Sequence, residues 1–244
     1  MSDGRGRLFG TVAELYDRYR PDPPEGLAAY LGDLSGRRVL DVGAGTGKLT
    51  RFLLARRARV CAVEPDDAMR SVLLARSPGV EAVAAPAEAL PFAEGSVDLV
   101  ASCSAWHWFG HPAAERESAR VLRDDGRLVV AWNGLSRTEG WVRDLVARRE
   151  RDDDPDRRPR GSHADLSAGP FEDVADFELD WVWRRSVAEL VALFATYSGS
   201  LARPEHERRG LFDAVAAEAA ARAVEGVVEV PMSLRGTTAR RIAR

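Results

Sequence analysis

The sequence predicts an α/β protein. We expect a Rossmann-like, mostly parallel sheet with helices on both faces, a C-terminal antiparallel strand pair and a small, partly helical cap. Three observations lead to this fold class. Strand-like apolar runs alternate with helix-like segments over residues 37–133. A glycine-rich turn follows the first run directly. After Asn133 the alternation stops, and the remaining strand patterns are separated by helical segments.

Residues 1–36 are predicted to hold two short helices that precede the core. Apolar or aromatic residues recur at helical spacing, at Val12, Leu15, Tyr16 and Tyr19. The prolines of "RPDPP" end this first helix, and "EGLAAYLGDL" predicts a second.

Residues 37–133 form the predicted cofactor-binding core. Strands are expected at 37–43, 59–65, 80–85, 96–105 and 126–133. Helices are expected between them at 47–57, 66–77 and 112–123. Strands joined by crossover helices run parallel, and an open parallel sheet binds its ligand at the carboxyl ends of the strands. The segments that follow these strands are therefore the candidate site.

Residues 134–225 are predicted to form a cap or substrate segment, and 226–244 the last strand of the sheet. The cap contains a helix at 138–150, a strand at 171–184 and helices at 186–198 and 204–224. The charged, Pro- and Gly-containing stretch at 151–168 is expected to be a mobile loop rather than an active-site lid. Pro231 marks an irregularity or a sheet edge in the last strand.

The composition excludes several classes of protein. A chain of 244 residues with 45% hydrophobic and 30% charged residues is typical of one globular α/β domain. A net charge of −3 gives no basic surface for nucleic acid. No apolar run is long enough to span a membrane, and the start lacks an apolar signal region, so we expect a cytoplasmic protein. Cys61 and Cys103 lie in strand-like runs and are expected to be buried thiols, with no metal site.

The turn in "RRVLDVGAGTGKLT" raises the question of its ligand. A phosphate-binding loop requires G-x-x-x-x-G-K-[ST], but Val42 stands where its first glycine belongs and Leu49 follows the lysine. A dinucleotide fingerprint requires G-x-G-x-x-G, and Lys48 occupies its third glycine position. The remaining candidate is the amino-acid part of S-adenosylmethionine.

Side chains at the other strand ends suit a nucleoside. Glu64 ends the second strand about 20 residues after the glycine turn begins, where an acid accepts hydrogen bonds from ribose hydroxyls. Pro65 and Met69 offer apolar walls for adenine, and Ala87 and Glu88 offer a backbone N–H and a polar group at its edge. Asp41 precedes the turn and is suited to orient it or an ammonium group.

Four segments together carry a family resemblance: "VLDVGAGTGKLT", "VCAVEPDDAMR", "APAEALPFAEGSVDLV" and "SAWHWF". In this order the chain resembles class I S-adenosylmethionine-dependent methyltransferases, more narrowly the type 11 proteins related to trans-aconitate methyltransferase. The resemblance implies S-adenosylmethionine as cofactor and S-adenosylhomocysteine as product. Pro86 departs from the family, in which many members place Asp or Thr before the Ala-Glu pair.

The resemblance also implies roles for individual residues. Gly43 and Gly45 would lie beneath the methionine part and Glu64 at the ribose, while Ala87 and Glu88 would border the adenine. Ser104 and Ala105 would lie near the sulfonium. Tyr16 and Arg20 would close over the cofactor, with Arg20 at its carboxylate, and Lys48 would point to solvent.

His107 is the candidate catalytic base, because a neutral imidazole after the fourth strand suits proton abstraction near the methyl group. The alternative is a histidine packed between Trp106 and Trp108 that only shapes the pocket. An aromatic substrate pocket is expected from Trp106, Trp108, Trp132 and Trp141.

The sequence thus favours a methyltransferase that acts on a small-molecule acceptor, at an oxygen of a carboxylate or hydroxyl. N- or C-methylation stays open. Two other classes also stay open: an NAD-dependent oxidoreductase, and a module that binds the cofactor without catalysis.

Overall fold

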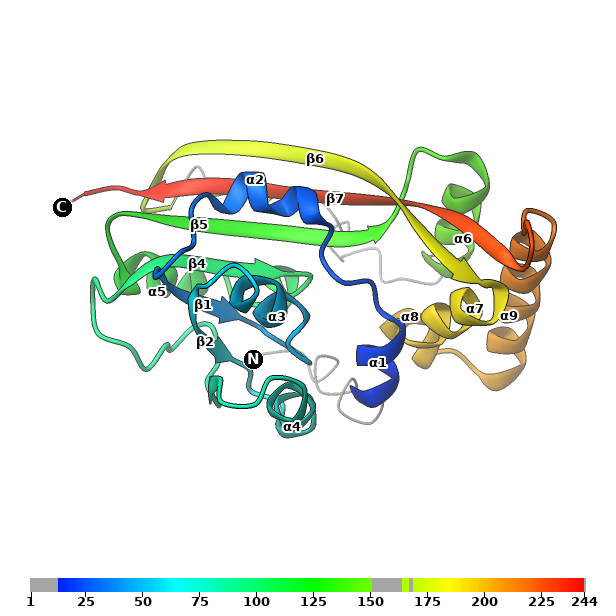
Figure 1. Ribbon diagram of the computed structural model, residues 1–244, viewed down its shortest axis with the longest axis horizontal. Helices are drawn as coiled ribbons and strands as arrows, with labels where there is room; N and C mark the ends of the chain where they lie inside the picture. The colour runs from blue at the N-terminus through cyan, green and yellow to red at the C-terminus, as the bar shows by residue number, and fades with distance from the viewer. Residues whose placement is uncertain (1–12, 151–163, 167–168, 244) are drawn as a thin grey trace.

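One seven-stranded sheet runs through the molecule in the order β3-β2-β1-β4-β5-β7-β6 (Figure 1). The computed structural model describes residues 13–150, 164–166 and 169–243, so most of the expected loop at 151–168 lies outside the described residues. Five strands pair in parallel: β1 (Arg38–Val42), β2 (Arg59–Val63), β3 (Glu81–Val83), β4 (Val97–Cys103) and β5 (Leu122–Leu135). β7 (Val227–Arg241) and β6 (Phe171–Ser186) continue the sheet antiparallel. The predicted fold class is confirmed.

The central strands are apolar on both faces because both faces are covered. In β1, Val39 packs into one hydrophobic core, while Leu40 and Val42 pack into the other. Successive side chains of a strand point to opposite faces, so a strand between two layers of helices needs a nearly continuous apolar run. This explains why the buried part of "RVLDV", after the exposed Arg38, has no polar residue except Asp41 near the carboxyl end of the strand.

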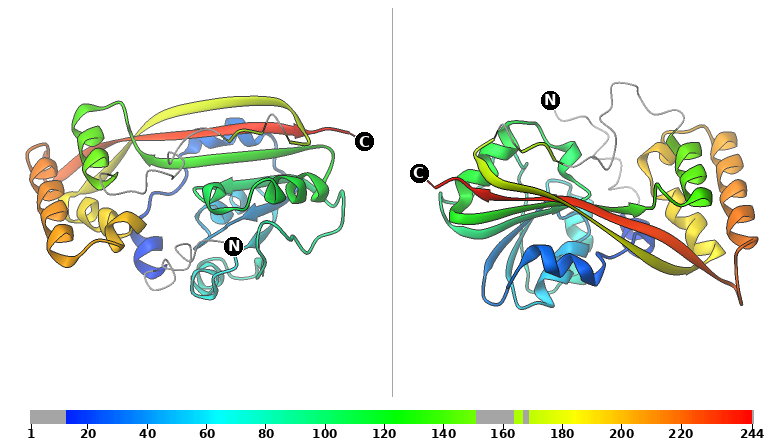
Figure 2. Two further views of the ribbon diagram at one scale, coloured as in Figure 1. Left: turned by 180° about the vertical axis from the view of Figure 1, so that it is seen from behind. Right: turned by 90° about the horizontal axis from the view of Figure 1, so that it is seen from above.

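Helices cover the two faces of the parallel part unequally, as Figure 2 shows. On one face lie the short turn η2 (Glu25–Leu27) with α2 (Ala28–Leu31), and α3 (Lys48–Leu54). α4 (Asp67–Arg76) covers the same face through Leu73, which packs on Ala62 of β2. The other face is covered by α5 (Ala113–Val121). Asp66 caps α4 by accepting hydrogen bonds from the backbone N–H groups of Ala68 and Met69, each at 3.0 Å.

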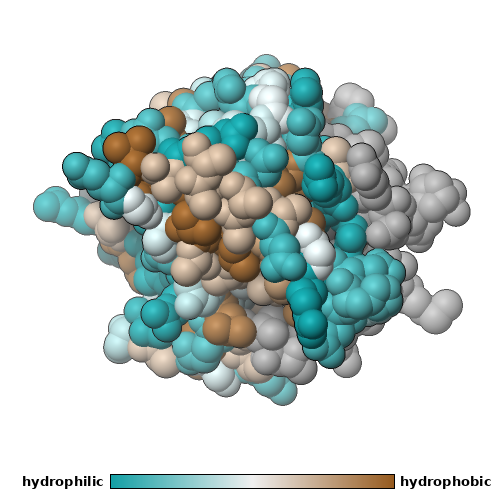
Figure 3. Space-filling model, turned by 90° about the vertical axis from the view of Figure 1, so that its right-hand side faces the viewer, coloured by the Kyte–Doolittle hydropathy of each residue, from teal (hydrophilic) through white to brown (hydrophobic). Residues whose placement is uncertain are grey.

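The C-terminal helices gather beyond one end of the sheet and form their own core with β6 and β7. These helices are α6 (Gly140–Glu150), α7 (Val187–Ala195), α8 (Ser198–Leu201) and α9 (Glu205–Ala220). A capping box of Ser186 and Glu189 begins α7. Figure 3 views this end of the molecule, where apolar residues gather near the centre of a mostly hydrophilic face. In the described part of the chain, no helix combines the length and apolar character that a membrane span needs.

The N-terminal helix α1 (Ala13–Tyr19) lies between the two groups of helices (Figure 1). Ala13 and Tyr16 pack against Met69 and Val72 of α4, and α1 also contacts α7. This short helix therefore joins the parallel core to the C-terminal helices across the edge where the β1 to β4 strands end.

β7 is an interior strand, which corrects the expectation that Pro231 marks a sheet edge: β7 lies between β5 and β6. The backbone of Pro231 faces the side where β5 ends, because its carbonyl accepts from the N–H of Ser136 at 3.0 Å. A residue in a strand directs its N and its C=O to the same side, so proline removes no donor from the β6 ladder. Pairing with β6 continues through Val182 opposite Pro231.

Candidate active site

A cavity of about 770 Å³ opens at the carboxyl ends of β1 to β5. Its lining includes every residue predicted to contact the cofactor: Tyr16, Arg20, Asp41, Gly43, Gly45, Glu64, Pro65, Met69, Ala87, Glu88, Ser104 and Ala105. His107, Trp108 and Trp132 line it as well. The fold thus brings together segments separated by more than 100 residues of sequence.

The glycine turn after β1 has a left-handed backbone at Gly43, Gly45 and Gly47, with φ of 71°, 56° and 85°. A Cβ on Gly43 would lie 2.5 Å from the Ala105 Cβ, so the backbone there is packed tightly under the β4 loop. A Cβ on Gly45 would meet nothing within 4 Å. Gly43 therefore serves the fold of the turn, whereas Gly45 leaves open space in the cavity.

Glu64 holds the turn in place. Its Oε2 accepts from the Gly45 N–H at 2.8 Å, and its Oε1 accepts from the Asp66 N–H at 2.9 Å. Burial raises the pKa of this carboxyl, and the two backbone hydrogen bonds oppose the rise. Each carboxylate oxygen has a second lone pair, so Glu64 keeps the capacity to accept from a ligand's hydroxyl groups.

Two buried side-chain oxygens at the cavity have no hydrogen-bond partner within the described structure: Oδ1 of Asp41 and Oγ1 of Thr46. The other oxygen of Asp41 accepts from the Thr50 hydroxyl at 2.6 Å. Burial, with a contribution from Glu64, raises the pKa of Asp41 to about 7. An unsatisfied buried oxygen is costly, so both atoms suit a polar ligand that donates to them. The sequence analysis missed Thr46, although a hydroxyl inside "GAGTG" was a signal for it.

The end of β4 carries a strained residue. Ser104 has a φ of 61°, an unfavourable backbone for a residue with a side chain. Its N–H donates to the Ala131 carbonyl at 2.7 Å, and its hydroxyl accepts from the Asn133 N–H at 3.3 Å. The turn at Ser104 directs the following segment into the cavity. Burial raises the pKa of the neighbouring Cys103 thiol to about 12.

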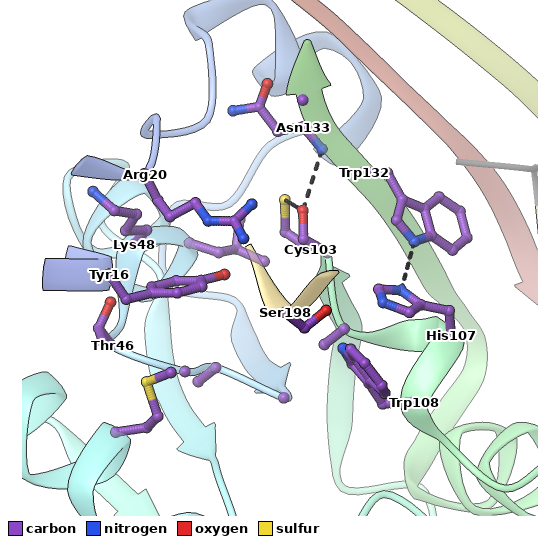
Figure 4. Close-up of a pocket in the computed structure, with 18 of the residues that line it drawn as sticks. Tyr16, Arg20, Thr46, Lys48, Cys103, His107, Trp108, Trp132, Asn133 and Ser198 are labelled. Atoms are coloured by element: carbon purple, nitrogen blue, oxygen red, sulfur yellow. Dashed lines mark hydrogen bonds between the residues drawn. The ribbon is translucent and has the colours of Figure 1, made fainter. Parts of the chain in front are cut away.

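His107 lies in the 3-10 turn η3 (Trp106–Trp108) and points toward Trp132 of β5 (Figure 4). The indole Nε1–H of Trp132 donates to Nδ1 of His107 at 3.0 Å. The rings of His107 and Trp108 are 4.7 Å apart between centroids. His107 therefore lies beside Trp108 and Trp132, and the hydrogen bond from β5 orients its ring.

Two predicted pocket tryptophans do not line the cavity. Trp106 is 3% exposed and packs edge-on against Phe109 at 5.5 Å, because consecutive residues of a tight turn point in different directions. Trp141 on α6 is covered instead by the guanidinium of Arg222, which follows α9 and lies 5.0 Å from the centre of its ring. Both tryptophans serve packing, and the expectation that they line a substrate pocket is corrected.

Arg20 and Arg149 stack on Tyr197. Their guanidinium carbons lie 3.9 Å and 4.1 Å from the centre of its ring. Arg20 also donates to the Thr196 carbonyl at 3.1 Å, while its buried Nε has no hydrogen-bond partner in the described structure. Lys48 pairs with Asp22 at 2.9 Å instead of pointing to solvent.

The remaining lining comes from the end of β5, α6, the α7–α8 turn and β7; we call it the acceptor side. Its polar side chains were not identified from the sequence, and they include Arg137, Arg149, Tyr197, Ser198, Ser233 and Arg235. Arg149 is only 7% exposed, and Arg235 donates to Glu178 at 2.7 Å. The acids that line the cavity among the described residues are Asp41, Glu64, Asp66 and Glu88, and they lie at the ends of β1 to β3. We call those strand-end loops, together with the β4 loop and α1, the cofactor side.

Comparisons with known proteins agree with this geometry. The sequence profile of the methyltransferase domain family matches residues 40–130. An uncharacterized methyltransferase of Mycobacterium tuberculosis is 38% identical over 207 residues, covering 85% of this chain and 83% of the relative. A malonyl-[acyl-carrier protein] O-methyltransferase of Methylococcus capsulatus is 36% identical over 140 residues, covering 53% of this chain and 51% of the relative.

Among solved structures, a candidate type II methyltransferase of Anaeromyxobacter dehalogenans superposes with a TM-score of 0.68 at 26% identity. The match covers 91% of this chain and 97% of that one. The open space at Gly45 and the unsatisfied oxygens of Asp41 and Thr46 fit S-adenosylmethionine, which has an amino-acid part with donors to satisfy them. An NAD-dependent oxidoreductase is thereby set aside. The chain belongs to the class I S-adenosylmethionine-dependent methyltransferases.

Proposed function

We propose that the enzyme methylates an oxygen of a small, anionic acceptor. The observation that carries this proposal is the placement of the acids in the cavity: the described lining acids lie on one side only, whereas cations also line the other side. Arginines line the acceptor side, at Arg137, Arg149 and Arg235, and the described lining acids are all on the cofactor side. S-adenosylmethionine brings a methyl group on a positively charged sulfur, so acids near the cofactor and arginines near the acceptor match a cation and an anion.

The cofactor roles follow from the same geometry. Gly45 leaves room for the methionine part, Asp41 faces its ammonium group, and Glu64 accepts from the ribose hydroxyls. Arg20, with an unsatisfied buried Nε, binds the carboxylate from α1.

The remaining cofactor contacts come from apolar and small residues. Pro65 and Met69 form apolar walls, Ala87 and Glu88 border the adenine, and Ser104 and Ala105 lie near the sulfonium. Tyr16 closes the cavity from α1. Burial raises the pKa of Tyr16, so it stays a neutral phenol.

The helices between residues 134 and 225 act as a cap over the methyl group. α6 and the α7–α8 turn supply Arg149 and Tyr197 to the acceptor side, and the distant relative named as an O-methyltransferase is consistent with an oxygen acceptor. The net charge of −3 does not favour nucleic acid as the substrate. N- and C-methylation remain alternatives, and the methyl-transfer assay described next distinguishes them from O-methylation.

The experiment is methyl transfer from labelled S-adenosylmethionine to a panel of small acids, alcohols and amines. We expect transfer to acids. Arg149→Gln should raise the KM for the acid by about 10–100-fold, the range for a lost charge-assisted hydrogen bond, with little change in cofactor affinity. Arg209→Gln, on the exposed surface of α9, is the matched control. Transfer to amines alone, or an unchanged KM in Arg149→Gln, would count against the proposal.

A further inference from the structure

The hydrogen bond between Trp132 and His107 determines where His107 carries its proton. An indole nitrogen only donates. Trp132 Nε1 lies 3.0 Å from Nδ1 of His107, so Nδ1 must present its lone pair. A neutral imidazole carries one proton, which then resides on Nε2. A proton on Nδ1 would point at the indole N–H and break this bond.

We infer that His107 is not the base of the reaction but a hydrogen-bond donor, held in its Nε2–H form by Trp132, that positions an acceptor oxygen which is already ionised. To act as a base through Nε2, His107 would need its proton on Nδ1, and Trp132 opposes that form. Trp132 is thus a positioning residue and His107 the residue that touches the acceptor. This inference rests on the proposed function and narrows it to carboxylates.

No other described lining group offers a base on the acceptor side. The carboxylates are engaged in the turns of the cofactor side: Glu64 accepts from Gly45 and Asp66, Asp66 caps α4, and Glu88 accepts from the Gly110 N–H. Asp41 lies behind the glycine turn and accepts from Thr50. The arginines of the acceptor side are always protonated. Among the described residues, the acceptor side therefore has no carboxylate that could take a proton from the acceptor.

A carboxylate needs no base. Its oxygen forms a bond to the methyl carbon as the carbon–sulfur bond breaks, the sulfur keeps the electron pair as a neutral thioether, and no proton moves. A donor at Nε2 then fixes which oxygen faces the methyl group, while Trp108 and Trp132 provide apolar walls on either side. The site therefore discriminates by the ionisation state of the acceptor, accepting carboxylates and rejecting phenols and alcohols of the same shape.

The first test reads the proton directly and requires no acceptor. Nitrogen NMR of the labelled full-length protein at neutral pH should show His107 with a protonated Nε2 and an unprotonated Nδ1. The signal is assigned by its loss in His107→Gln. Trp132→Phe keeps an aromatic wall but removes the donor, so His107 should become a mixture of the two forms. A wild-type His107 protonated on Nδ1 would overturn the inference, even if Trp132→Phe does not fold.

The second test uses activity. His107→Gln keeps an amide donor near the position of Nε2 and should retain carboxylate methylation within about tenfold. His107→Leu should lose about 10–100-fold in kcat/KM, the value of a hydrogen bond to a charged group. Acids should be methylated and phenols of matched shape should not. Faster methylation of the phenols would overturn the inference. Absence of transfer to any oxygen, with the NMR result as expected, would instead defeat the proposed function alone.

Discussion

The two sides of the cavity differ in how the chain builds them. The cofactor side is made of loops that each follow a strand within residues 37–133, completed by α1. The acceptor side is assembled from the end of β5, α6, the α7–α8 turn and β7, which are far apart in the sequence. The cofactor side is fixed by local turns, and the acceptor side by packing between distant elements. If the two sides bind the cofactor and the acceptor as proposed, the comparison predicts that cofactor binding and acceptor choice can change independently.

The largest expected effect is a loss of stability from Gly43→Ala, at the most tightly packed point of the cofactor side. A Cβ on Gly43 would lie 2.5 Å from the Ala105 Cβ and 2.9 Å from the Phe109 ring, at a φ of 71°. Gly43→Ala should lower the free energy of unfolding by about 2–5 kcal/mol, the sum of left-handed strain and overpacking. Chemical denaturation would measure this change.

Gly45→Ala is the matched variant. Its φ of 56° gives similar strain, but a Cβ there meets nothing within 4 Å. It should cost only about 1–2 kcal/mol of stability and mainly weaken binding of S-adenosylhomocysteine. Equal losses of stability in the two variants would show that the turn relaxes around Gly43, and that the distinction between a packing glycine and a cavity glycine is wrong.

A smaller effect is expected from Glu64→Gln, which should change cofactor binding but not acceptor binding. Its oxygens accept from the Gly45 and Asp66 N–H groups, so Glu64→Gln turns one acceptor into a donor facing a backbone N–H. Affinity for S-adenosylhomocysteine should fall by about 1–3 kcal/mol, measured by calorimetry. The KM for the acceptor should stay nearly constant at saturating cofactor, the reverse of Arg149→Gln. If both variants change both constants, the two sides are coupled and the comparison fails.

This difference between the sides also explains what the sequence could predict. The strands and helices of residues 37–133 repeat a regular alternation, and each strand end contributes its own residues to the cavity. Local patterns were therefore enough to predict that Glu64 and the glycine turn lie there. The sequence shows that Arg149, Tyr197 and Arg235 are polar, but not that α6, α7 and β7 bring them to one cavity. Their adjacency depends on how the C-terminal helices pack.

The same limit applies to the tryptophans. "AWHWF" indicates an aromatic cluster, but only the geometry of the η3 turn decides that Trp108 lines the cavity while Trp106 enters the core. Pattern-based reasoning also could not detect the indole N–H of Trp132 aimed at His107, because the two residues belong to different strand ends. Whether a histidine acts as a base or as a hydrogen-bond donor depends on the group bonded to its other ring nitrogen. The identity of the residue alone does not reveal that group.

The last expected effect concerns pH and Asp41. In the unfolded chain this carboxyl ionises near its ordinary value of 3.8, and burial raises its pKa in the folded protein to about 7. Between these values the folded state binds more protons than the unfolded state. Its contribution to stability is therefore fully present below about pH 4 and is lost as pH rises through about 7. Asp41→Asn should remove this contribution to the pH dependence of unfolding.

Cofactor binding should respond to pH in the opposite direction. A ligand ammonium beside the unsatisfied Oδ1 of Asp41 favours the ionised carboxylate. Below pH 7 binding must therefore expel a proton, and affinity for S-adenosylhomocysteine should rise about tenfold between pH of about 6 and about 8. Calorimetry in buffers of different ionisation enthalpy would count the proton released, and Asp41→Asn should give a flatter profile. A wild-type affinity that is constant over this range, with no proton released, would mean that Asp41 only holds Thr50 and the turn, and that the ammonium is bound elsewhere on the cofactor side.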